Sequence, residues 1–173
     1  MYKHEASDKW DWYESYLTYA NSLLPEAMLC VWLLTGELSY KNIAITSFDF
    51  LLSNIFNKSG IEVISNKNWL CKGQEATHFG EQPIDVTYTI MALGRFYDAL
   101  KDKEYLNKMN IAFNWFLGNN HLHQIIYNPR TGDCFDGLEE NQVNLNQGAE
   151  STISYLMARL TIEGYRFKLN NSY

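Results

Sequence analysis

Hydrophobic residues follow two different patterns along the chain. Residues 25–35, 83–100 and 148–165 are apolar on most faces of a helix, so they are predicted to be helices buried inside the protein. Residues 40–57 and 104–117 carry apolar residues on one side only, which predicts amphipathic helices with one face in water. The chain therefore alternates between buried helices and partly exposed ones.

The connections between these stretches are long and polar. Residues 8–20, before the first buried stretch, are predicted to be an amphipathic helix, and residues 137–146, before the last, a polar loop. Two β-hairpins are expected, each with a turn-forming segment in its centre. Their strands are residues 61–65 with 69–71 and residues 124–127 with 133–135.

The order of buried helix, turn, amphipathic helix and long connection repeats about every 60 residues, too long for tetratricopeptide or ankyrin arrays. Such a repeat predicts one all-α domain over residues 1–173, with about three α-hairpins in two concentric layers and short β-hairpins in the connections. Because every long connection precedes a buried helix, the N-terminal ends of the inner helices should gather at one end. Loops on a rigid scaffold commonly carry binding and catalytic residues.

Each buried helix has one carboxylate in its first turn, namely Glu26, Asp85 and Glu150. A carboxylate at this position is stabilised by the helix dipole, which alone could explain each of them. Alternatively, the three could converge on one site, since glycoside hydrolysis requires two carboxyl groups roughly 5–10 Å apart. Glu150 and Asp85 are the preferred catalytic pair, and Glu81, Glu26 and Asp136 are candidate substitutes.

Amides and aromatic rings surround these carboxylates in the sequence. The amides could bind sugar hydroxyls or could cap helices and order loops, and the rings could stack on a sugar or pack in the core. The candidate substrate-binding residues are Gln82, Asn144, Asn146, Gln147, Tyr19, Asn21, Trp69 and His78.

Composition and charge exclude several classes of protein. With 46% hydrophobic and 15% aromatic residues the chain is globular, and with a net charge of −6 and no basic cluster a nucleic-acid partner is not expected. Cys30, Cys71 and Cys134 are odd in number and widely spaced, which predicts reduced thiols and a cytoplasmic location. No apolar run is long enough to span a membrane.

Neither a metal nor a cofactor is expected. His121-x-His123 has the spacing of a metal-binding pair, but no third ligand accompanies it at suitable spacing. No glycine-rich phosphate loop and no Gly-x-Ser-x-Gly nucleophile motif is present.

Several motifs together resemble the α/α-toroid domain of the six-hairpin glycosidase type that is attached to or encoded near bacterial glycosyltransferases. The most specific is Asn-Leu-Asn-Gln-Gly-Ala-Glu-Ser-Thr at residues 144–152. The resemblance departs at Ala20, where an acidic residue is usual, and at Gly80-Glu81, where an Asp-Gln pair is usual. The other motifs lie at residues 12–14, 17–21, 24–27, 79–85, 115–120 and 131–138.

This resemblance implies a sugar-binding cleft lined by the N-terminal ends of the inner helices. It implies either a glycoside hydrolase with paired carboxylates or a non-catalytic module that binds a glycan or a glycosyltransferase. A scaffold whose polar motifs only order the loops is a further alternative. The chain has about six predicted helices where the complete toroid has twelve, so it resembles the C-terminal half, a partial (α/α)6 toroid.

A half toroid would leave the flanks of its first and last inner helices uncovered. A second copy in a homodimer, or the missing half, is expected to cover them. Alternatively, the N-terminal segment with Trp10 and Trp12 and the tail at residues 165–173 would fold across the flanks. The flank residues are Met28, Val31, Trp32 and Leu34 on the first helix and Ile153, Tyr155, Leu156 and Met157 on the last.

Overall fold

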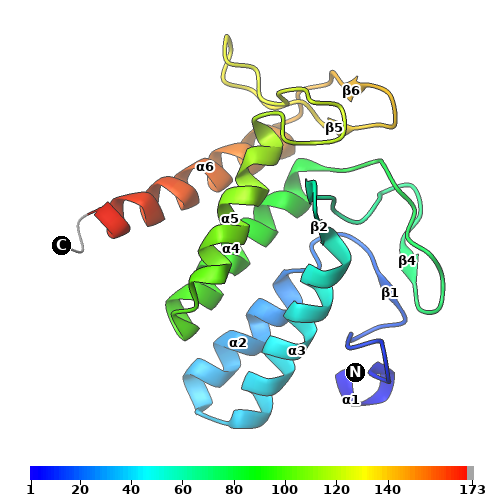
Figure 1. Ribbon diagram of the computed structural model, residues 1–173, viewed down its shortest axis with the longest axis vertical. Helices are drawn as coiled ribbons and strands as arrows, with labels where there is room; N and C mark the ends of the chain where they lie inside the picture. The colour runs from blue at the N-terminus through cyan, green and yellow to red at the C-terminus, as the bar shows by residue number, and fades with distance from the viewer. Residues whose placement is uncertain (171–173) are drawn as a thin grey trace.

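The computed structural model describes residues 1–170 of the chain, and helices account for most of this part (Figure 1). The short helix α1 covers Tyr2–Glu5, and two α-hairpins follow in which each pair of helices packs closely. The longer helices are α2 (Leu23–Thr35), α3 (Leu38–Ile55), α4 (Pro83–Leu100), α5 (Lys103–Phe116) and α6 (Ala149–Asn170).

Short antiparallel strand pairs tie the connections together. The pairs are β1 (Tyr16–Leu17) with β4 (Leu70–Cys71), β2 (Phe56–Asn57) with β3 (Gly60–Ile61), and β5 (Gly137–Leu138) with β6 (Val143–Asn144). The predicted fold class, α-hairpins with short β-hairpins in the connections, is confirmed.

The helix ends follow from local sequence. Pro83 occupies the first turn of α4, where its missing N–H costs no hydrogen bond. Gly36 ends α2 in the left-handed conformation, with φ of 74°, and its N–H bonds to the Trp32 carbonyl. The Asp102 side chain accepts a hydrogen bond from the Glu104 N–H and so caps α5.

Helices α2, α4 and α6 form the inner layer, and α3 and α5 lie outside them. Helix α4 packs against both other inner helices and against α5. Near their N-terminal ends, the Ser22 hydroxyl of the α2 N-cap bonds to Thr89, and the Thr87 hydroxyl donates to the Ser154 carbonyl. The three inner helices therefore run in the same direction as an arc, α2–α4–α6, as Figure 1 shows.

Burial of the inner helices depends on their place in this arc. Helix α4, with an inner neighbour on each side, buries ten residues, whereas α2 buries only Pro25 and Leu29. The prediction that α2 is buried on all faces is therefore wrong for this chain. Its apolar circumference is real, but an inner neighbour stands on one side of it only.

The N-terminal segment differs from the prediction. Residues 8–20 form bends and strand β1 rather than a helix. The consecutive residues Trp12 and Tyr13 are both buried, and Trp10 packs on Phe50 with ring centroids 5.1 Å apart. Burial of these aromatic side chains against α3 therefore overrides the helical pattern in the sequence.

The predicted hairpin of residues 61–65 with 69–71 is also wrong, because β3 pairs with β2 and β4 pairs with β1. The predicted hairpin around Pro129 is present, since Tyr127 and Cys134 form a bridge and the Asn128 N–H bonds to the Asp133 carbonyl at 2.6 Å. Within residues 1–170, no helix has the length and apolar character needed to cross a membrane.

Candidate functional site

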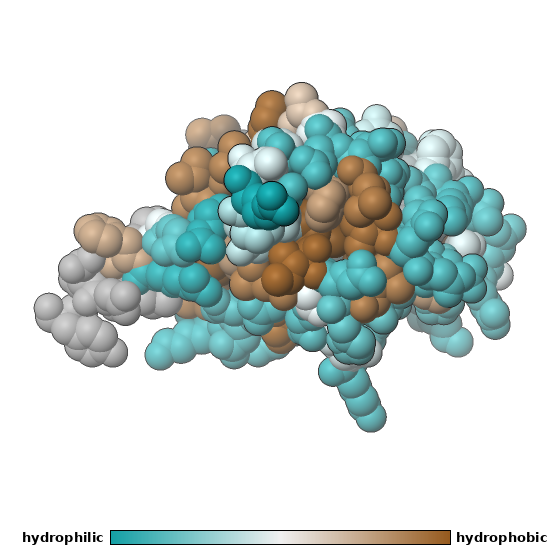
Figure 2. All heavy atoms as spheres, turned by 90° about the horizontal axis from the view of Figure 1, so that it is seen from above, coloured by the Kyte–Doolittle hydropathy of each residue, from teal (hydrophilic) through white to brown (hydrophobic). Residues whose placement is uncertain are grey.

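A polar cleft of about 280 Å³ lies at the N-terminal ends of α4 and α6. Its walls carry the acidic side chains Glu81, Asp136, Glu139 and Glu150 beside the amides of Asn66, Gln82 and Asn144. A second, wider basin of about 740 Å³, formed by Lys67 and residues 139–145, shares Glu139 and Asn144 with this cleft. Figure 2 views the molecule from this end and shows apolar side chains at the surface among polar ones.

Asp85 is the carboxyl group in the first turn of α4, and its side chain is only 7% exposed. Its Oδ1 accepts a hydrogen bond from the Ala20 N–H at 2.6 Å. Burial raises the pKa of Asp85 to about 7, opposed by this hydrogen bond and reinforced by the charge of Glu150. Near neutral pH the group can therefore hold or release a proton.

Glu150, in the first turn of the neighbouring helix α6, is exposed and lines the cleft. Its charge acts on Asp85, so the two first-turn carboxyl groups of adjacent inner helices are electrostatically coupled. One is buried with a raised pKa and the other is open to solvent. Groups in such unequal environments suit the roles of acid and base.

Ala20, which holds Asp85, has a left-handed backbone with φ of 53°. This conformation is unfavourable for a residue with a Cβ, and it is maintained here by the surrounding loop. Asn21 supports the loop, because its Oδ1 accepts from the Thr18 N–H and its Nδ2 donates to the Thr18 carbonyl, both at 2.9 Å. Asn21 is buried and orders the loop.

Asp136 organises the start of α6. Its Oδ1 accepts hydrogen bonds from the Gly148 N–H at 2.8 Å and the Ser151 hydroxyl at 2.7 Å. Its own N–H donates to the Asn146 carbonyl at 2.8 Å. Asp136 thus lines the cleft and at the same time fixes the chain that delivers Glu150.

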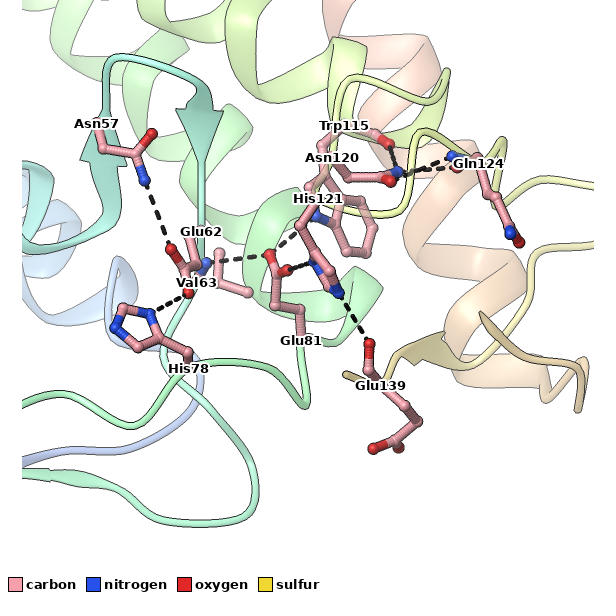
Figure 3. A network of polar contacts seen from close by, with 10 residues as sticks. All are labelled: Asn57, Glu62, Val63, His78, Glu81, Trp115, Asn120, His121, Gln124 and Glu139. Carbon is pink, nitrogen blue, oxygen red and sulfur yellow. Dashed lines mark hydrogen bonds and ion pairs between the residues drawn. The ribbon is translucent and has the colours of Figure 1, made fainter. Parts of the chain in front are cut away.

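Glu81 is the centre of a buried polar network, shown in Figure 3. Its Oε2 accepts hydrogen bonds from Trp115 Nε1 at 2.9 Å and the Val63 N–H at 3.4 Å, and its Oε1 lies 3.2 Å from His121 Nδ1. Burial raises the pKa of Glu81 despite these contacts, and the hydrogen bond to Glu81 raises the pKa of His121. His121 Nε2 also contacts the Glu139 carbonyl. The pair of Glu81 and His121 therefore connects the segments of Val63, Glu81, Trp115 and Glu139.

The partnership of His121 with Glu81 was not predicted, because only its spacing from His123 stands out in the sequence. The two partners are forty positions apart. The one local signal for a special role of Glu81 is its position. It lies between Gly80 and Pro83, in the short loop that leads into the buried helix α4. Among residues 1–170, no three histidine, cysteine, aspartate or glutamate side chains are grouped as metal ligands.

Glu26 lies elsewhere. Its Oε1 is 3.6 Å from Arg95 Nε, far along α4 from Asp85, and its Oε2 is buried with no hydrogen-bond partner among the described residues. Burial raises the pKa of Glu26, and Arg95 opposes the shift. The structure therefore brings Glu150, Glu81 and Asp136 into the wall of the cleft. Asp85 lies at the same end of the inner layer but outside the cleft wall, in a small pocket with Asn21, Ser22 and Thr89. Glu26 also lies outside the cleft.

The candidate substrate-binding residues also divide. Gln82 and Asn144 line the cleft, whereas Asn146 and Gln147 are exposed on the loop before α6. Tyr19 is 65% exposed, and the half-exposed Trp69 stacks on Tyr16 with centroids 5.9 Å apart. His78 Nδ1 pairs with Glu62 at 2.6 Å in a second cleft, of about 270 Å³, beyond Glu81.

No model of a known protein family matches the chain, and no curated protein matches it in sequence. Solved structures do match, and they share its fold. A family 76 glycoside hydrolase (mannosidase) from Bacteroides thetaiotaomicron aligns with a TM-score of 0.66 at 14% identity, over 88% of this chain and 40% of its own. An α-1,6-mannanase of Salegentibacter, in complex with α-1,6-mannotriose, aligns at 0.62 and 15% identity, over 86% and 42%.

A third structure, a family 76 hydrolase from a bovine strain of B. thetaiotaomicron, aligns at 0.56 and 13% identity, over 83% of this chain and 34% of its own. The Salegentibacter protein is an inactive variant with two consecutive aspartates replaced by asparagine. The present chain has no consecutive aspartates, and its adjacent acidic pair is Glu139–Glu140. The chain spans between about a third and two-fifths of these proteins and shares their α/α-toroid fold over that part.

Proposed function

We propose that the cleft at the N-terminal ends of α4 and α6 binds an oligosaccharide, and that Glu150 in its wall and Asp85, buried at the same end of the inner layer, hydrolyse a glycosidic bond there. The observation that carries this proposal is the unequal pair itself. A buried carboxyl and an exposed carboxylate occupy the first turns of adjacent inner helices in a glycosidase fold. The neighbours are named as mannosidase and mannanase, so α-linked manno-oligosaccharides are the first substrates to test.

The two groups have separate roles in this reaction. Asp85, protonated up to near neutral pH, donates its proton to the leaving oxygen as the C–O bond breaks. Glu150 acts on the opposite side as the carboxylate, either by attacking the anomeric carbon or by accepting a proton from the attacking water. Gln82 and Asn144 supply donors and acceptors for sugar hydroxyls.

The test is incubation with α-1,6-mannotriose and longer manno-oligosaccharides, with products identified by chromatography and mass spectrometry. Asp85→Asn and Glu150→Gln should each lower turnover by at least 100-fold, because each removes one of the two required groups. Glu26→Gln is the matched control, since it changes the first-turn carboxyl group of α2, which contacts Arg95. Equal loss in all three variants, or turnover unaffected by Asp85→Asn, would reject the assignment.

The second candidate is non-catalytic glycan binding, as in a module that works beside a glycosyltransferase. It is favoured by the open basin next to the cleft. Under this proposal calorimetry detects binding of manno-oligosaccharides without products, and Asp85→Asn leaves the affinity within a factor of about three. Asn144→Ala removes a side chain of the cleft and should weaken binding whether or not the protein is catalytic. A variant that keeps its affinity but loses turnover has therefore lost the chemistry and not the binding site.

A further inference from the structure

The His121 ring lies between a carbonyl oxygen and a carboxyl group. Its Nε2 is 2.9 Å from the Glu139 carbonyl oxygen, and its Nδ1 is 3.2 Å from Glu81 Oε1 (Figure 3). A carbonyl oxygen can only accept a hydrogen bond, so Nε2 must carry a hydrogen. The ring therefore donates to Glu139 and faces the Glu81 carboxyl group with its second nitrogen.

The contact between Nδ1 and Oε1 needs a proton of its own. Either Nδ1 is protonated and Glu81 is ionised, or Glu81 holds the proton and donates it to Nδ1. The other carboxyl oxygen, Oε2, already accepts hydrogen bonds from Trp115 Nε1 and the Val63 N–H. One proton is thus shared between His121 and Glu81, and the two contacts of the ring exist together only while that proton is present.

The Glu139 carbonyl belongs to the turn between β5 and β6, residues 139–142, which we call the hairpin tip. The hairpin tip walls the wide basin, and its Glu139 also lines the cleft. Two side chains from other segments hold Glu139: Lys67 pairs with its carboxylate, and His121 donates to its carbonyl. The pair with Lys67 is solvent-exposed and so contributes little, which leaves His121 as the main attachment.

We propose that His121 is a positioning residue for the wall of the cleft, holding the hairpin tip while the proton shared with Glu81 is present and releasing it when that proton leaves. Without the proton, the neutral ring has one N–H for two acceptors. The Glu81 side chain is only 2% exposed, so leaving Oε1 without a donor costs more than releasing a carbonyl that water can reach. The N–H therefore stays on Nδ1, and the Nε2 lone pair repels the Glu139 carbonyl.

The direction of the pH dependence follows from this arrangement. The hydrogen bond to Glu81 raises the pKa of His121 above 6.5. The contribution of the contact with Glu139 is therefore fully present below pH 6.5 and is lost as the pH rises through the raised pKa. The other titratable or charged groups around the pair are Glu62 and His78 in the second cleft, His123 on the same loop, and Lys67, Glu140 and the Glu139 carboxylate at the hairpin tip.

The first test is hydrogen exchange of the backbone amides of residues 139–142 in the whole chain, between about pH 5 and pH 10. Exchange is expressed as protection relative to an unfolded peptide, which cancels its intrinsic pH dependence. Protection should fall at least about tenfold as His121 loses its proton, an event that nitrogen NMR of the histidine rings follows directly. His123→Asn, the same type of change two positions along the exposed loop, should leave the profile unchanged. Constant protection in wild type would overturn the proposal.

The second test uses two variants that change the donors in opposite ways. His121→Asn keeps an amide N–H near the position of Nδ1 but is too short to reach Glu139, so the hairpin tip should be released at every pH. Glu81→Gln places an amide N–H opposite Nδ1, while its oxygen still accepts from Trp115. The neutral ring then accepts through Nδ1 and donates to Glu139 through Nε2, so this variant should hold the hairpin tip in alkali and release it in acid.

The pH profile of Glu81→Gln should therefore be the reverse of that of wild type. A profile with the same direction as wild type would overturn the proposal. So would wild-type protection at pH 6 in His121→Asn, a variant that keeps the donor to the buried carboxyl group and so tests the proposal on its own.

The consequence for ligand affinity rests on the proposed function and is measured separately, by calorimetry with α-1,6-mannotriose. Affinity should fall at least about threefold when wild type releases the hairpin tip in alkali, and this fall should be absent in Glu81→Gln. Asp85 titrates in both proteins, so the comparison isolates the hairpin tip. Failure to bind at any pH would reject the proposed function, whereas the exchange profiles alone decide the role of His121.

Discussion

The replacement Asp85→Asn should stabilise the protein while abolishing the proposed activity. Asparagine has nearly the same shape, and its Oδ1 can still accept the hydrogen bond that Ala20 N–H donates at 2.6 Å. What it removes is the cost of a charge in a side chain only 7% exposed. A variant that is more stable but inactive would show that Asp85 serves the reaction, whereas a less stable variant would show that it serves the fold.

The magnitude follows from the pKa. Burial raises the pKa of Asp85 from 3.8 to about 7, so the folded state holds a proton that the unfolded chain releases. The stability associated with this proton is fully present below pH 3.8 and is lost as the pH rises to 7. At about 1.4 kcal/mol for each unit, the loss above pH 7 is on the order of 4 kcal/mol.

The assay is urea unfolding of wild type and variant at several pH values. The free energy of unfolding of the variant should equal that of wild type below pH 4. The difference in favour of the variant should grow between pH 4 and pH 7 and stay constant at about 2–4 kcal/mol above pH 7. Asp8→Asn, at an exposed position, is the control for general effects of charge and should show no such trend. A variant less stable than wild type at pH 8 would refute the reasoning.

Other predictions concern the network around the cleft. Glu81→Ala should lower the free energy of unfolding by about 3–5 kcal/mol in urea titrations, since it breaks a buried pair and leaves Trp115 Nε1 without its acceptor; a loss below 1 kcal/mol would contradict this. Gly137→Ala should cost more than about 1 kcal/mol in thermal unfolding, because φ is 155° and the new Cβ would lie 2.3 Å from the Glu81 carbonyl oxygen. Burial raises the pKa of Cys134 to about 12, so a thiol reagent should modify the exposed Cys30 at once and Cys134 only after unfolding.

Periodicity predicted the longer helices because their ends and their apolar positions are set by the local sequence. Pro83 and Gly36 mark helix ends by their own backbone preferences, wherever the rest of the chain lies. The extent of burial was not predictable in the same way. The apolar circumference of α2 is the pattern of a helix with neighbours on all sides, and sequence periodicity cannot show on how many sides the folded chain supplies one.

The connections were predicted less well because their pairing is decided over long distances. Strand β4 has a plausible partner a few residues away but pairs with β1, more than fifty positions earlier. The candidate site shows the same limit. Equivalent helix starts predicted that the three first-turn carboxyl groups would converge. The charge of Glu150 does act on Asp85, but nothing local distinguishes Glu26, which contacts Arg95 instead.

The pairing of β1 with β4 has a consequence for the order of folding. Each α-hairpin is made from contacts close in sequence, which form quickly because little chain entropy is lost when a short loop closes. The strand pair instead closes a loop that contains the whole α2–α3 hairpin. The N-terminal aromatic segment therefore joins the native structure late, after α2 and α3 have formed the surface on which Trp10 and Trp12 pack. During synthesis, strand β1 has no partner until residues 70–71 have left the ribosome.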